Sequence, residues 1–563
     1  MPARGCGAGR VRARQGDSVS TRPSQEAGPT TTPLREHTIG ADLLATVRAH
    51  GTRDALVECA TGRRWTYREF LREVDAVALG LWADGVRPGD RVAVWAPNCA
   101  EWVFVQYACA RLGAVLVTVN PAYRSHELVH VLRQSGARTV IAAPSFKTSD
   151  YAAMLAQAAP ECPDLLDVVL IGEESWGALL ESGRCTDPAV LADIGERLHP
   201  DDPVNIQYTS GTTGFPKGAT LSHRNILNNG FFVGELLHYT ERDRIAVPVP
   251  FYHCFGMVMG NLAATSHGAA LVIPAPAFDP AATLAAVAAE RCTSLYGVPT
   301  MFIAALAVPD FDDYELGSLR TGIMAGSTCP VDTMRQVISR MGVEEISICY
   351  GMTETSPVSM QTRTDDSLER RVATVGRPGP HIEVRIVDPE TGAVAPRGVP
   401  GEFCTRGYPV MLGYWDQPEK TAEAIDADGW MHTGDLAVMD DDGYASITGR
   451  IKDMVIRGGE NLYPREIEEF LITHPDIVDA QVVGVPDEKY GEELMAWLRM
   501  REGAPALNPE AVRAFCDGSL PRHKIPKYVH LVEDFPMTVT GKVRKVQMRA
   551  EAVRLLGLRP PPA

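Results

Sequence analysis

Residues 91–119 read RVAVWAPNCAEWVFVQYACARLGAVLVTV and predict a strand, a helix and a second strand in immediate succession. The apolar run at residues 91–96 is typical of a buried strand, residues 100–114 have the length and pattern of a helix, and residues 115–119 form another buried run. Two such strands joined by a helix are expected to run parallel in one sheet. The stretch therefore predicts a fold of the α/β class.

The same alternation extends in both directions from this stretch. Thr66 is followed three residues later by Glu69, which is the spacing of a capping box, and then by apolar residues at helical period. Further patterns alternate along the chain, namely a helix from Ser125, a strand at residues 139–144, a strand at 270–276, a helix at 280–291 and a strand at 294–302. We expect two α/β lobes, each with a parallel sheet covered by helices.

The pattern changes after about Thr374. Short extended segments separated by Gly, Pro and Asp turns indicate a small antiparallel sheet or barrel. Pro464 then stands where a first helical turn accepts proline, and it opens an amphipathic helix within a compact α+β segment. We therefore predict a disordered tail at residues 1–38, a large domain at 39–450, a hinge at 451–452, a small mobile domain at 453–550 and a second tail at 551–563.

Composition and charge narrow the classes of function. The 563 residues are 45% hydrophobic and 22% charged, which is ordinary for a globular protein of more than one domain. Acidic residues outnumber basic residues by 71 to 54, and the net charge of −17 argues against a broad face for nucleic acid. The sequence lacks a run of eighteen apolar residues, so we expect no transmembrane segment, while peripheral contact with a membrane stays open.

The cysteines and the N-terminal residues indicate the cellular compartment in which the protein is expected. The 12 cysteines are scattered without a Cys-x-x-Cys pair, which favours free thiols in a reducing compartment, and we expect a cytoplasmic location. Residues 1–38 carry several arginines among Gly, Ser, Thr and Pro. A transit peptide to the mitochondrial matrix and an over-extended start are therefore alternatives to the disordered tail. The sequence does not specify an oligomeric state.

The segment YTSGTTGFPKG, residues 208–218, combines bare backbone, hydroxyl groups and one positive charge. Closely spaced glycines let backbone N–H groups surround an anion, the Ser and Thr hydroxyls add donors, and Lys217 adds charge. The segment is therefore interpreted as a cradle for phosphate oxygens rather than as a flexible linker. It differs from the common nucleoside-triphosphatase loop, because Pro216 and Gly218 stand where that pattern requires Gly and Ser or Thr.

This segment is the first of five motifs that resemble, in their order, the core motifs of the acyl-adenylate-forming enzymes. The others are YGMTETSP at residues 350–357, TGD at 433–435, GRIKDMVIRGGENLYP at 449–464 and TVTGKVRK at 538–545. A looser likeness runs from about Asp42 to Ala550. Within the superfamily, two further segments are more similar to medium-chain fatty-acyl-CoA synthetases than to luciferases or peptide-synthetase domains. They are PFYHCFGMVMG at residues 250–260 and LYGVPTMF at residues 295–302.

The resemblance implies a two-step reaction of ATP, a carboxylic acid and CoA. The acid, by this likeness a medium-chain fatty acid, would form acyl-AMP with release of pyrophosphate, and the acyl group would then pass to CoA with release of AMP. The adenylate is needed because a carboxylate is a poor acyl donor, whereas AMP is a good leaving group. One alternative acceptor is the pantetheine of a carrier protein. A non-catalytic nucleotide-binding relative is a further alternative, which the presence of Glu354 and Lys542 disfavours.

The resemblance also implies the residues that bind ATP. The phosphates would contact Thr209, Ser210, Gly211, Thr212, Thr213, Gly214 and Lys217. The rest of the nucleotide would contact Gly326, Ser327, Tyr350, Gly351, Met352, Thr353, Asp435, Arg450 and Lys542. Among these, Tyr350 would lie against adenine, Asp435 would bind the ribose hydroxyls, and Arg450 would reach ribose or phosphate. Glu354 would hold Mg²⁺, and the catalytic residues would be Lys217, Thr353, Glu354 and Lys542.

The acyl pocket, the path of CoA and a hinge are implied in the same way. The acyl pocket would include His253, Phe255, Met259 and Gly326, and CoA would pass Arg457, Gly458 and Gly459. Lys452 matches the hinge position about which the small domain would turn. Lys542 would be brought onto the α-phosphate and the carboxylate for adenylation and then withdrawn to make room for the thiol.

A rival motif, HELVH at residues 126–130, satisfies the zinc-protease pattern His-Glu-x-x-His on a predicted helix. A zinc hydrolase would use His126, Glu127 and His130, with Glu161 as a possible third ligand. The extended form of the motif is absent, because Arg133 and Gly136 stand at the positions that would need Gly and His. The surrounding segment also resembles a structural stretch of the adenylating enzymes, so the ligase interpretation is preferred.

Overall fold

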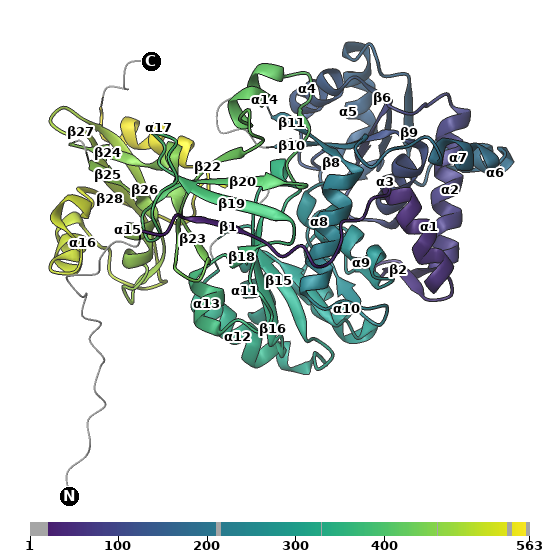
Figure 1. The fold of residues 1–563 in the computed structure, drawn as a ribbon. Helices are drawn as coiled ribbons and strands as arrows, with labels where there is room; N and C mark the ends of the chain where they lie inside the picture. The colour runs from purple at the N-terminus through teal and green to yellow at the C-terminus, as the bar shows by residue number, and fades with distance from the viewer. Residues whose placement is uncertain (1–20, 210–215, 328, 459, 538–542, 559–563) are drawn as a thin grey trace, which may run out of the picture.

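The first α/β lobe is built on a seven-stranded sheet with mainly parallel pairing (Figure 1). The computed structural model describes residues 21–209, 216–327, 329–458, 460–537 and 543–558. In spatial order the strands of the sheet are β21 (Gly413–Tyr414), β11 (Lys217–Ser222), β10 (Pro203–Thr209), β5 (Val115–Thr118), β4 (Arg91–Trp95), β6 (Ala137–Ala142) and β9 (Asp167–Leu170). The stretch quoted above forms β4, α3 and β5, with β4 parallel to β5, so the prediction from residues 91–119 is confirmed.

The helices of this lobe are α2 (Tyr67–Ala83), α3 (Ala100–Leu112), α4 (Ser125–Ser135), α5 (Tyr151–Ala158), α6 (Glu174–Cys185), α7 (Ala189–Gly195) and α8 (His223–Leu236). Helices α2, α3 and α4 of this lobe begin where the sequence indicated. The predicted capping box of α2 is present, since the Thr66 side chain accepts from the Glu69 N–H and the Glu69 carboxylate accepts from the Thr66 N–H. Helix α3 ends at Gly113, whose φ of 73° is the left-handed conformation that glycine adopts without strain.

The second lobe is a nine-stranded sheet whose inner strands are parallel. In spatial order its strands are β18 (Arg377–Pro378), β17 (Met360–Gln361), β16 (Glu345–Tyr350), β15 (Thr321–Ala325), β14 (Ser294–Gly297), β12 (Arg244–Ala246), β13 (Ala270–Ile273), β2 (Asp54–Glu58) and β3 (Arg63–Thr66). Its helices are α9 (Ala263–Ser266), α10 (Pro280–Glu290), α11 (Pro299–Leu306), α12 (Val331–Met341) and α13 (Leu368–Ala373), and α1 (Ile39–His50) packs against α2, α3 and α9. The prediction of an α/β fold with two lobes is therefore confirmed.

The barrel-like piece is a five-stranded antiparallel sheet, as the sequence after Thr374 predicted. Its strands are β1 (Gln25–Ala27), β19 (Ile382–Val387), β20 (Gly401–Gly407), β22 (Met431–Met439) and β23 (Ala445–Arg450), and α14 (Pro418–Ala424) lies between β21 and β22 in the chain. Its small core includes Ile382, Phe403 and Ala437, which are buried.

The C-terminal residues form a separate sheet and helices at one end of the molecule (Figure 1). The sheet contains β24 (Val455–Arg457), β25 (Glu460–Leu462), β26 (Ile477–Asp487), β27 (Gly491–Met500) and β28 (Tyr528–Val532), and the helices are α15 (Pro464–Leu471), α16 (Pro509–Cys516) and α17 (Lys545–Leu555). Pro464 is the first residue of α15, as predicted. The expected tail at residues 551–563 is wrong for residues 551–558. Helix α17 continues to Leu555, and Leu558 packs against the hydrophobic cluster that contains the buried Met548.

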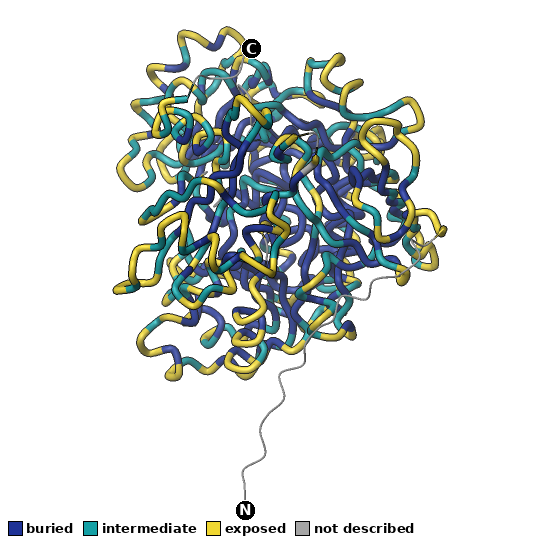
Figure 2. Tube along the Cα trace, turned by 90° about the vertical axis from the view of Figure 1, so that its left-hand side faces the viewer, coloured by how far each residue is buried: buried dark blue, intermediate teal, exposed yellow. Residues whose placement is uncertain are grey.

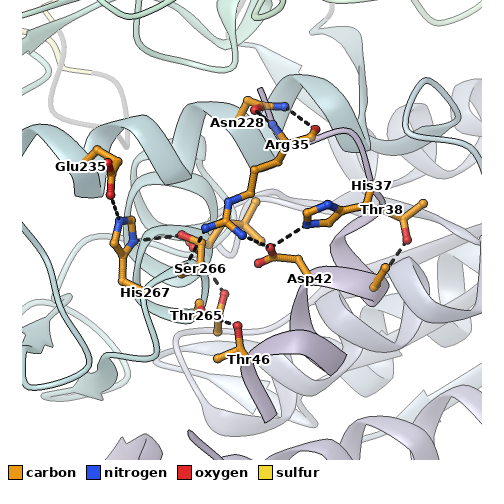
Figure 3. A network of polar contacts seen from close by, with 12 residues as sticks. Arg35, His37, Thr38, Asp42, Thr46, Asn228, Glu235, Thr265, Ser266 and His267 are labelled. Carbon is orange, nitrogen blue, oxygen red and sulfur yellow. Dashed lines mark hydrogen bonds and ion pairs between the residues drawn. The ribbon is translucent and has the colours of Figure 1, made fainter. Parts of the chain in front are cut away.

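The expected N-terminal tail is also wrong for residues 21–38. Strand β1 pairs with β19, and the residues after it cross to α1, α8 and α9 (Figure 3). The Arg35 backbone N–H donates to Asn228 Oδ1 of α8 at 2.7 Å, and the Arg35 guanidinium donates to the buried Asp42 carboxylate of α1 at 2.8 Å. This attachment depends on partners far along the chain, which the local composition of residues 1–38 does not show.

Buried residues fill the interior of the molecule, and exposed residues lie mainly on the outer loops (Figure 2). The largest hydrophobic cluster joins α2, α3 and α8 to the first sheet, and includes the fully buried Trp102 and Tyr107. The 11 cysteines of the described ranges are free thiols. Across those same ranges, each helix is too short or too polar to cross a membrane.

Candidate active site

The segment that follows β16 carries several of the predicted site residues. Strand β16 ends at Tyr350, and a 3₁₀ turn at Thr353–Thr355 carries the next side chains of the YGMTETSP motif. Gly351 allows this turn, because a Cβ at that position would lie 1.8 Å from the carbonyl oxygen of Pro357. Tyr350, Gly351, Met352, Thr353 and Glu354 therefore stand together at the end of an inner strand of the second sheet. Ligand sites in α/β folds commonly form at such strand ends.

Tyr350, Asp435 and Arg450 are in contact. The Tyr350 hydroxyl donates to Asp435 Oδ2 at 2.8 Å, and Arg450 Nε donates to Asp435 Oδ1 at 3.0 Å. Asp435 and Arg450 are paired across β22 and β23, so the barrel positions both charges. The attraction of Asp435 raises the pKa of Arg450, and burial raises the pKa of Tyr350, so the guanidinium stays charged and the phenol stays protonated. An aromatic ring, a carboxylate and a guanidinium match the base, ribose and phosphate of a nucleotide.

Glu354 and Lys217 meet through Tyr414, which sequence reasoning missed. The Tyr414 hydroxyl donates to Glu354 Oε1 at 2.8 Å, and the Lys217 ammonium lies 4.2 Å from the centre of the Tyr414 ring. Strand β21 brings Tyr414 here by pairing with β11, the strand that Lys217 begins. Burial lowers the pKa of Lys217, and the neighbouring Lys452 ammonium lowers it further, while Glu354 opposes the shift. Nothing local in the sequence marks Tyr414, because its role depends on the pairing of β21 with β11.

The predicted phosphate cradle connects two antiparallel strands, β10 and β11. Thr209 ends β10, Lys217 begins β11, and the two are directly paired in the antiparallel ladder. In the chain, β11 stands between the predicted cradle and α8. Ser210, Gly211, Thr212, Thr213 and Gly214 lie outside the described residues. The structure therefore describes the two ends of the predicted cradle, Thr209 and Lys217.

Gly326 and Ser327 follow β15, the neighbour of β16, and both are exposed. The register pairs Ala325 with Cys349, so Gly326 lies beside Tyr350 at the same edge of the sheet. Gly326 has a φ of 96°, which side-chain-bearing residues rarely adopt, and a Cβ there would approach Val298 to 3.1 Å. The structure thus brings these two predicted nucleotide contacts to the Tyr350 side of the site.

Two of the predicted acyl-pocket residues, Phe255 and Met259, lie in a π-helix, Phe255–Leu262, and His253 precedes it by two residues. π-Helical segments are rare and frequently occur at functional sites. Phe255 and Met259 are buried, and the Phe255 ring packs on Tyr296 with 5.8 Å between ring centres. The His253 Nδ1 atom accepts from the Phe255 N–H at 3.1 Å.

The acyl-pocket segment is tied to the phosphate strand. The Cys254 N–H donates to Gln207 Oε1 at 3.1 Å, and Gln207 belongs to β10, two residues before Thr209. Gln207 is buried, so this contact is shielded from water. The assignment of His253, Phe255 and Met259 to an acyl pocket stays a prediction, and their connection to β10 is compatible with it.

Lys452 lies in a short turn, Ile451–Asp453, between the barrel and the C-terminal sheet. Arg549 of α17 donates to the Lys452 carbonyl oxygen at 2.8 Å and lies 3.4 Å from Asp453 Oδ1. Arg457 and Gly458 follow in the β24–β25 hairpin, where Arg457 pairs with Glu493 at 2.5 Å. Gly459 and Lys542 lie outside the described residues. The hinge and the path of CoA therefore stay predictions.

The zinc-protease motif lies on a capped helix. Helix α4 carries the motif, and the Glu127 carboxylate accepts from the Arg124 N–H as part of the cap of this helix. His130 Nε2 lies 3.3 Å from the carbonyl oxygen of Pro216. Among residues 21–558 as far as they are described, no cluster of side chains that could hold a metal includes His126 or His130. The hydrolase alternative has no support.

Two family models match this chain. The model described as AMP-binding enzyme matches residues 43–415, which is more than half of the chain, and that described as AMP-binding enzyme C-terminal domain matches residues 466–542. The chain belongs to the AMP-binding enzyme family. The resemblance to acyl-adenylate-forming enzymes is thereby confirmed.

Relatives of this AMP-binding enzyme cover nearly its whole length. It is 48% identical to "Putative acyl-CoA synthetase YngI" of Bacillus subtilis (strain 168), over 93% of this chain and 99% of the relative. It is 44% identical to "Medium-chain acyl-CoA ligase ACSF2, mitochondrial" of Danio rerio, over 93% of this chain and 90% of the relative. Of these two relatives, the second is named as mitochondrial.

Solved structures show the same fold. The structure of ATP-bound MatB from Rhodopseudomonas palustris matches this AMP-binding enzyme with a TM-score of 0.82 and 32% identity, over 93% of this chain and all of MatB. The anthranilate CoA ligase AuaEII in complex with anthranoyl-AMP matches with a TM-score of 0.82 and 26% identity, over 94% of this chain and 99% of AuaEII. Both matches extend through the small domain as well as the two lobes.

Proposed function

We propose that this enzyme is an AMP-forming acid–CoA ligase that acts on medium-chain fatty acids. The observation that carries the proposal is the meeting of two clusters on residues 350–354, with Tyr350, Asp435 and Arg450 on one side and Glu354 and Lys217 on the other. The cluster of Tyr350, Asp435 and Arg450 suits the nucleoside of ATP, and the cluster of Glu354 and Lys217 suits its triphosphate. The printed names of YngI and the ACSF2 ligases support the acyl-CoA product, and ATP-bound MatB and anthranoyl-AMP-bound AuaEII support the nucleotide.

The first half-reaction brings a carboxylate to the α-phosphate of ATP. Both reactants are anions, so the main task of the protein is to offset their repulsion with cations and N–H donors. Lys217 and Arg450 supply positive charge from β11 and β23, and the cradle at Thr209–Gly214 would supply backbone N–H groups. Lys542 would add a mobile ammonium at the reacting atoms. The carboxylate oxygen attacks phosphorus, the bond to the β-phosphate oxygen breaks, and pyrophosphate leaves.

Mg²⁺ would be held by Glu354. This residue is buried, with 5% of its surface exposed, and it accepts a hydrogen bond from Tyr414 while lying near Lys217. A carboxylate oxygen is the hard donor that Mg²⁺ prefers, and one carboxylate with phosphate oxygens is a usual ligand set for it. The ion would neutralise charge on the triphosphate oxygens.

The second half-reaction transfers the acyl group from AMP to the thiol of CoA. The thiol sulfur forms the new bond to the acyl carbon, the bond to the phosphate oxygen of AMP breaks, and the thiol proton is lost to the surroundings. We propose that rotation about Lys452 withdraws Lys542 and brings the hairpin of Arg457, Gly458 and Gly459 to the site. Glycine in that hairpin would let pantetheine pass close to the backbone.

A pyrophosphate-release assay with fatty acids of graded length, with and without CoA, tests the proposal. We expect release to be fastest with medium-chain acids, and acyl-CoA to form at the same rate as AMP when CoA is present. Acid-dependent pyrophosphate release without thioester formation on CoA would favour the carrier-protein alternative. Absence of acid-dependent release with all acids would contradict adenylation itself.

A further inference from the structure

A carboxylate, a thiol and an imidazole meet on the barrel beside the candidate nucleotide site. Cys404 of β20 and His432 of β22 are direct cross-strand partners, and Glu402 precedes Cys404 by two residues, so all three side chains share one face of the sheet. His432 Nδ1 lies 2.8 Å from Glu402 Oε2 and 3.5 Å from Cys404 Sγ. One ligand atom from each residue lies within 4.8 Å of the others.

We propose that Glu402, Cys404 and His432 form a binding site for a divalent cation of the zinc class. One oxygen, one sulfur and one nitrogen are ligands that Zn²⁺ accepts in tetrahedral sites, with the fourth position taken by water. A thiolate and an imidazole favour Zn²⁺ over Mg²⁺ or Ca²⁺, which prefer oxygen ligands. The site is separate from Glu354, the predicted ligand of Mg²⁺.

Further contacts orient two of the three ligands. Glu402 Oε1 accepts from the Gly434 N–H at 3.0 Å, which leaves Oε2 directed at His432. His432 Nε2 lies 3.5 Å from Asp426 Oδ2, on the opposite side of the ring from Nδ1. A carboxylate behind the second ring nitrogen is the usual partner of a metal-bound histidine, because it fixes the ring and its tautomer. The arrangement therefore has the outer contacts of a metal site as well as its ligands.

Charge and access are compatible with a cation. Cys404 is fully buried, and burial together with the Glu402 charge raises the pKa of its thiol to about 12. A bound cation would stabilise the thiolate against both effects. The competing cation is Arg385, the cross-strand partner of Cys404 on β19, which lies beside the thiol and donates to Asp426 Oδ2 at 3.0 Å. The His432 side chain is 31% exposed, which gives an ion a route from solvent.

The position of the cluster indicates what a bound ion would do. The register of β20 and β22 shifts between His432 and Leu436, and the residues of this bulge carry the Asp435 carboxylate. An ion held by Glu402, Cys404 and His432 would join the two strands at the base of the bulge. We therefore assign the site a structural effect on the strand that presents Asp435, with no part in the chemical steps.

Cobalt(II) binding to the full-length, chelator-treated protein without substrates tests the site. We expect saturation at one equivalent, a thiolate-to-cobalt charge-transfer band in the near ultraviolet, and loss of that band when Zn²⁺ is added. Cys404→Ser is expected to abolish the band. Two control variants, Cys185→Ser at an exposed cysteine and Cys292→Ser at a buried one, are expected to keep it.

A second variant keeps the test decisive if Cys404→Ser does not fold. Glu402→Gln retains an oxygen that accepts from the Gly434 N–H but removes the anionic ligand, and we expect affinity for Zn²⁺ to fall at least ~10-fold. Failure of the wild-type protein to bind cobalt at one equivalent would overturn the proposal. So would an unchanged band in folded Cys404→Ser, or an unchanged Zn²⁺ affinity in Glu402→Gln. None of these outcomes depends on ligase activity, so they are distinct from failure of the proposed function.

Discussion

Asp435, which we propose to bind the ribose hydroxyls, is held by two partners of the protein itself. Its two oxygens accept from Tyr350 and Arg450, and the residue is 8% exposed. An aspartate with two such partners is held in one orientation before any nucleotide arrives. Ribose hydroxyls can then donate to its remaining lone pairs without a change of rotamer.

Replacement of Asp435 by Asn is therefore expected to weaken ATP binding. The neutral amide is a weaker acceptor for ribose hydroxyls, and it removes the carboxylate to which Arg450 donates. Charged hydrogen bonds contribute about 1.5–3 kcal/mol, so the KM for ATP is expected to rise ~10-fold or more. Asp388→Asn, at an exposed turn of the same barrel, is the matched control and is expected to leave KM unchanged. An equal effect of both substitutions would contradict the role of Asp435.

His223 makes the stability of the protein depend on pH. It is the first residue of α8, it is fully buried, and its Nδ1 atom accepts from the Ile39 N–H at 3.3 Å. Burial lowers the pKa of His223 from 6.5 to about 4, although Asp202 opposes the shift. Between these two pH values the unfolded chain binds a proton that the folded chain excludes. Stability from this residue is complete above pH 6.5 and is lost as pH falls towards 4.

The test is urea unfolding of wild-type protein and His223→Asn at pH 7 and pH 5. Asn offers an oxygen to the Ile39 N–H but does not titrate. We expect wild-type protein to lose about 2 kcal/mol more than the variant between the two pH values, since one pKa unit corresponds to about 1.4 kcal/mol. Equal losses would show that His223 is not the titrating group.

At the scale of elements, helices α2 and α6 touch through glycines. A Cβ at Gly183 of α6 would lie 1.9 Å from the Ala76 carbonyl oxygen, and one at Gly80 of α2 would lie 2.3 Å from that of Leu179. Contacts this short involve backbone, which cannot rotate away as a side chain can. The two helices therefore pack closely only because both positions lack a side chain.

Gly183→Ala is expected to destabilise the first lobe by about 1–3 kcal/mol, the usual range for overpacking a close contact. Gly177 provides the control on the same helix, because a Cβ there meets no atom within 4 Å. Gly177→Ala is expected to be neutral or to stabilise by about 0.4–1 kcal/mol through reduced freedom of the unfolded chain. Thermal unfolding of the two variants beside wild-type protein gives the comparison, and similar Tm values would contradict the close packing.

The sequence predicted elements whose signals are local. The capping box of α2, the strands β4 and β5, the helix from Ser125 and the proline at the start of α15 are present. It missed β1 and β11, whose partners are β19 and β10. It also missed Tyr414, which reaches Glu354 only through the pairing of β21 with β11. Propensity and period do not encode such pairings, because they depend on the whole arrangement of strands.

Most of the predicted site residues came from the order of the five motifs, and few came from periodicity or charge alone. Asp435 and Arg450 considered singly look like solvated residues of a turn-rich region, and their contact follows from the β22–β23 ladder. Lys217 was identified from charge beside glycines and hydroxyls. The acyl pocket could not be specified to the same degree, because the depth of a tunnel depends on backbone placement that a sequence pattern does not contain.

At the scale of the whole molecule, the proposed reaction needs two positions of the small domain. Lys542→Ala is expected to abolish acid-dependent pyrophosphate exchange while sparing thioester formation from supplied acyl-adenylate. Gly459→Trp is expected to do the reverse, slowing thioester formation more than adenylation, since bulk would block the path of CoA. Each variant is the control for the other in the two half-reaction assays. Equal loss of both half-reactions in either variant would contradict rotation about Lys452.

Strands β1 and β19 pair although they are far apart in the sequence. Gln25 leaves the ribosome early, yet its partner Arg385 is made about 360 residues later. During that interval the second α/β lobe and all of the first except β21 can form while β1 has no strand to join. Until β1 docks, β19 presents an open edge that could pair with another chain. Shortening the N-terminus beyond Gln25 would make that exposure permanent, so truncated protein is expected to aggregate on expression.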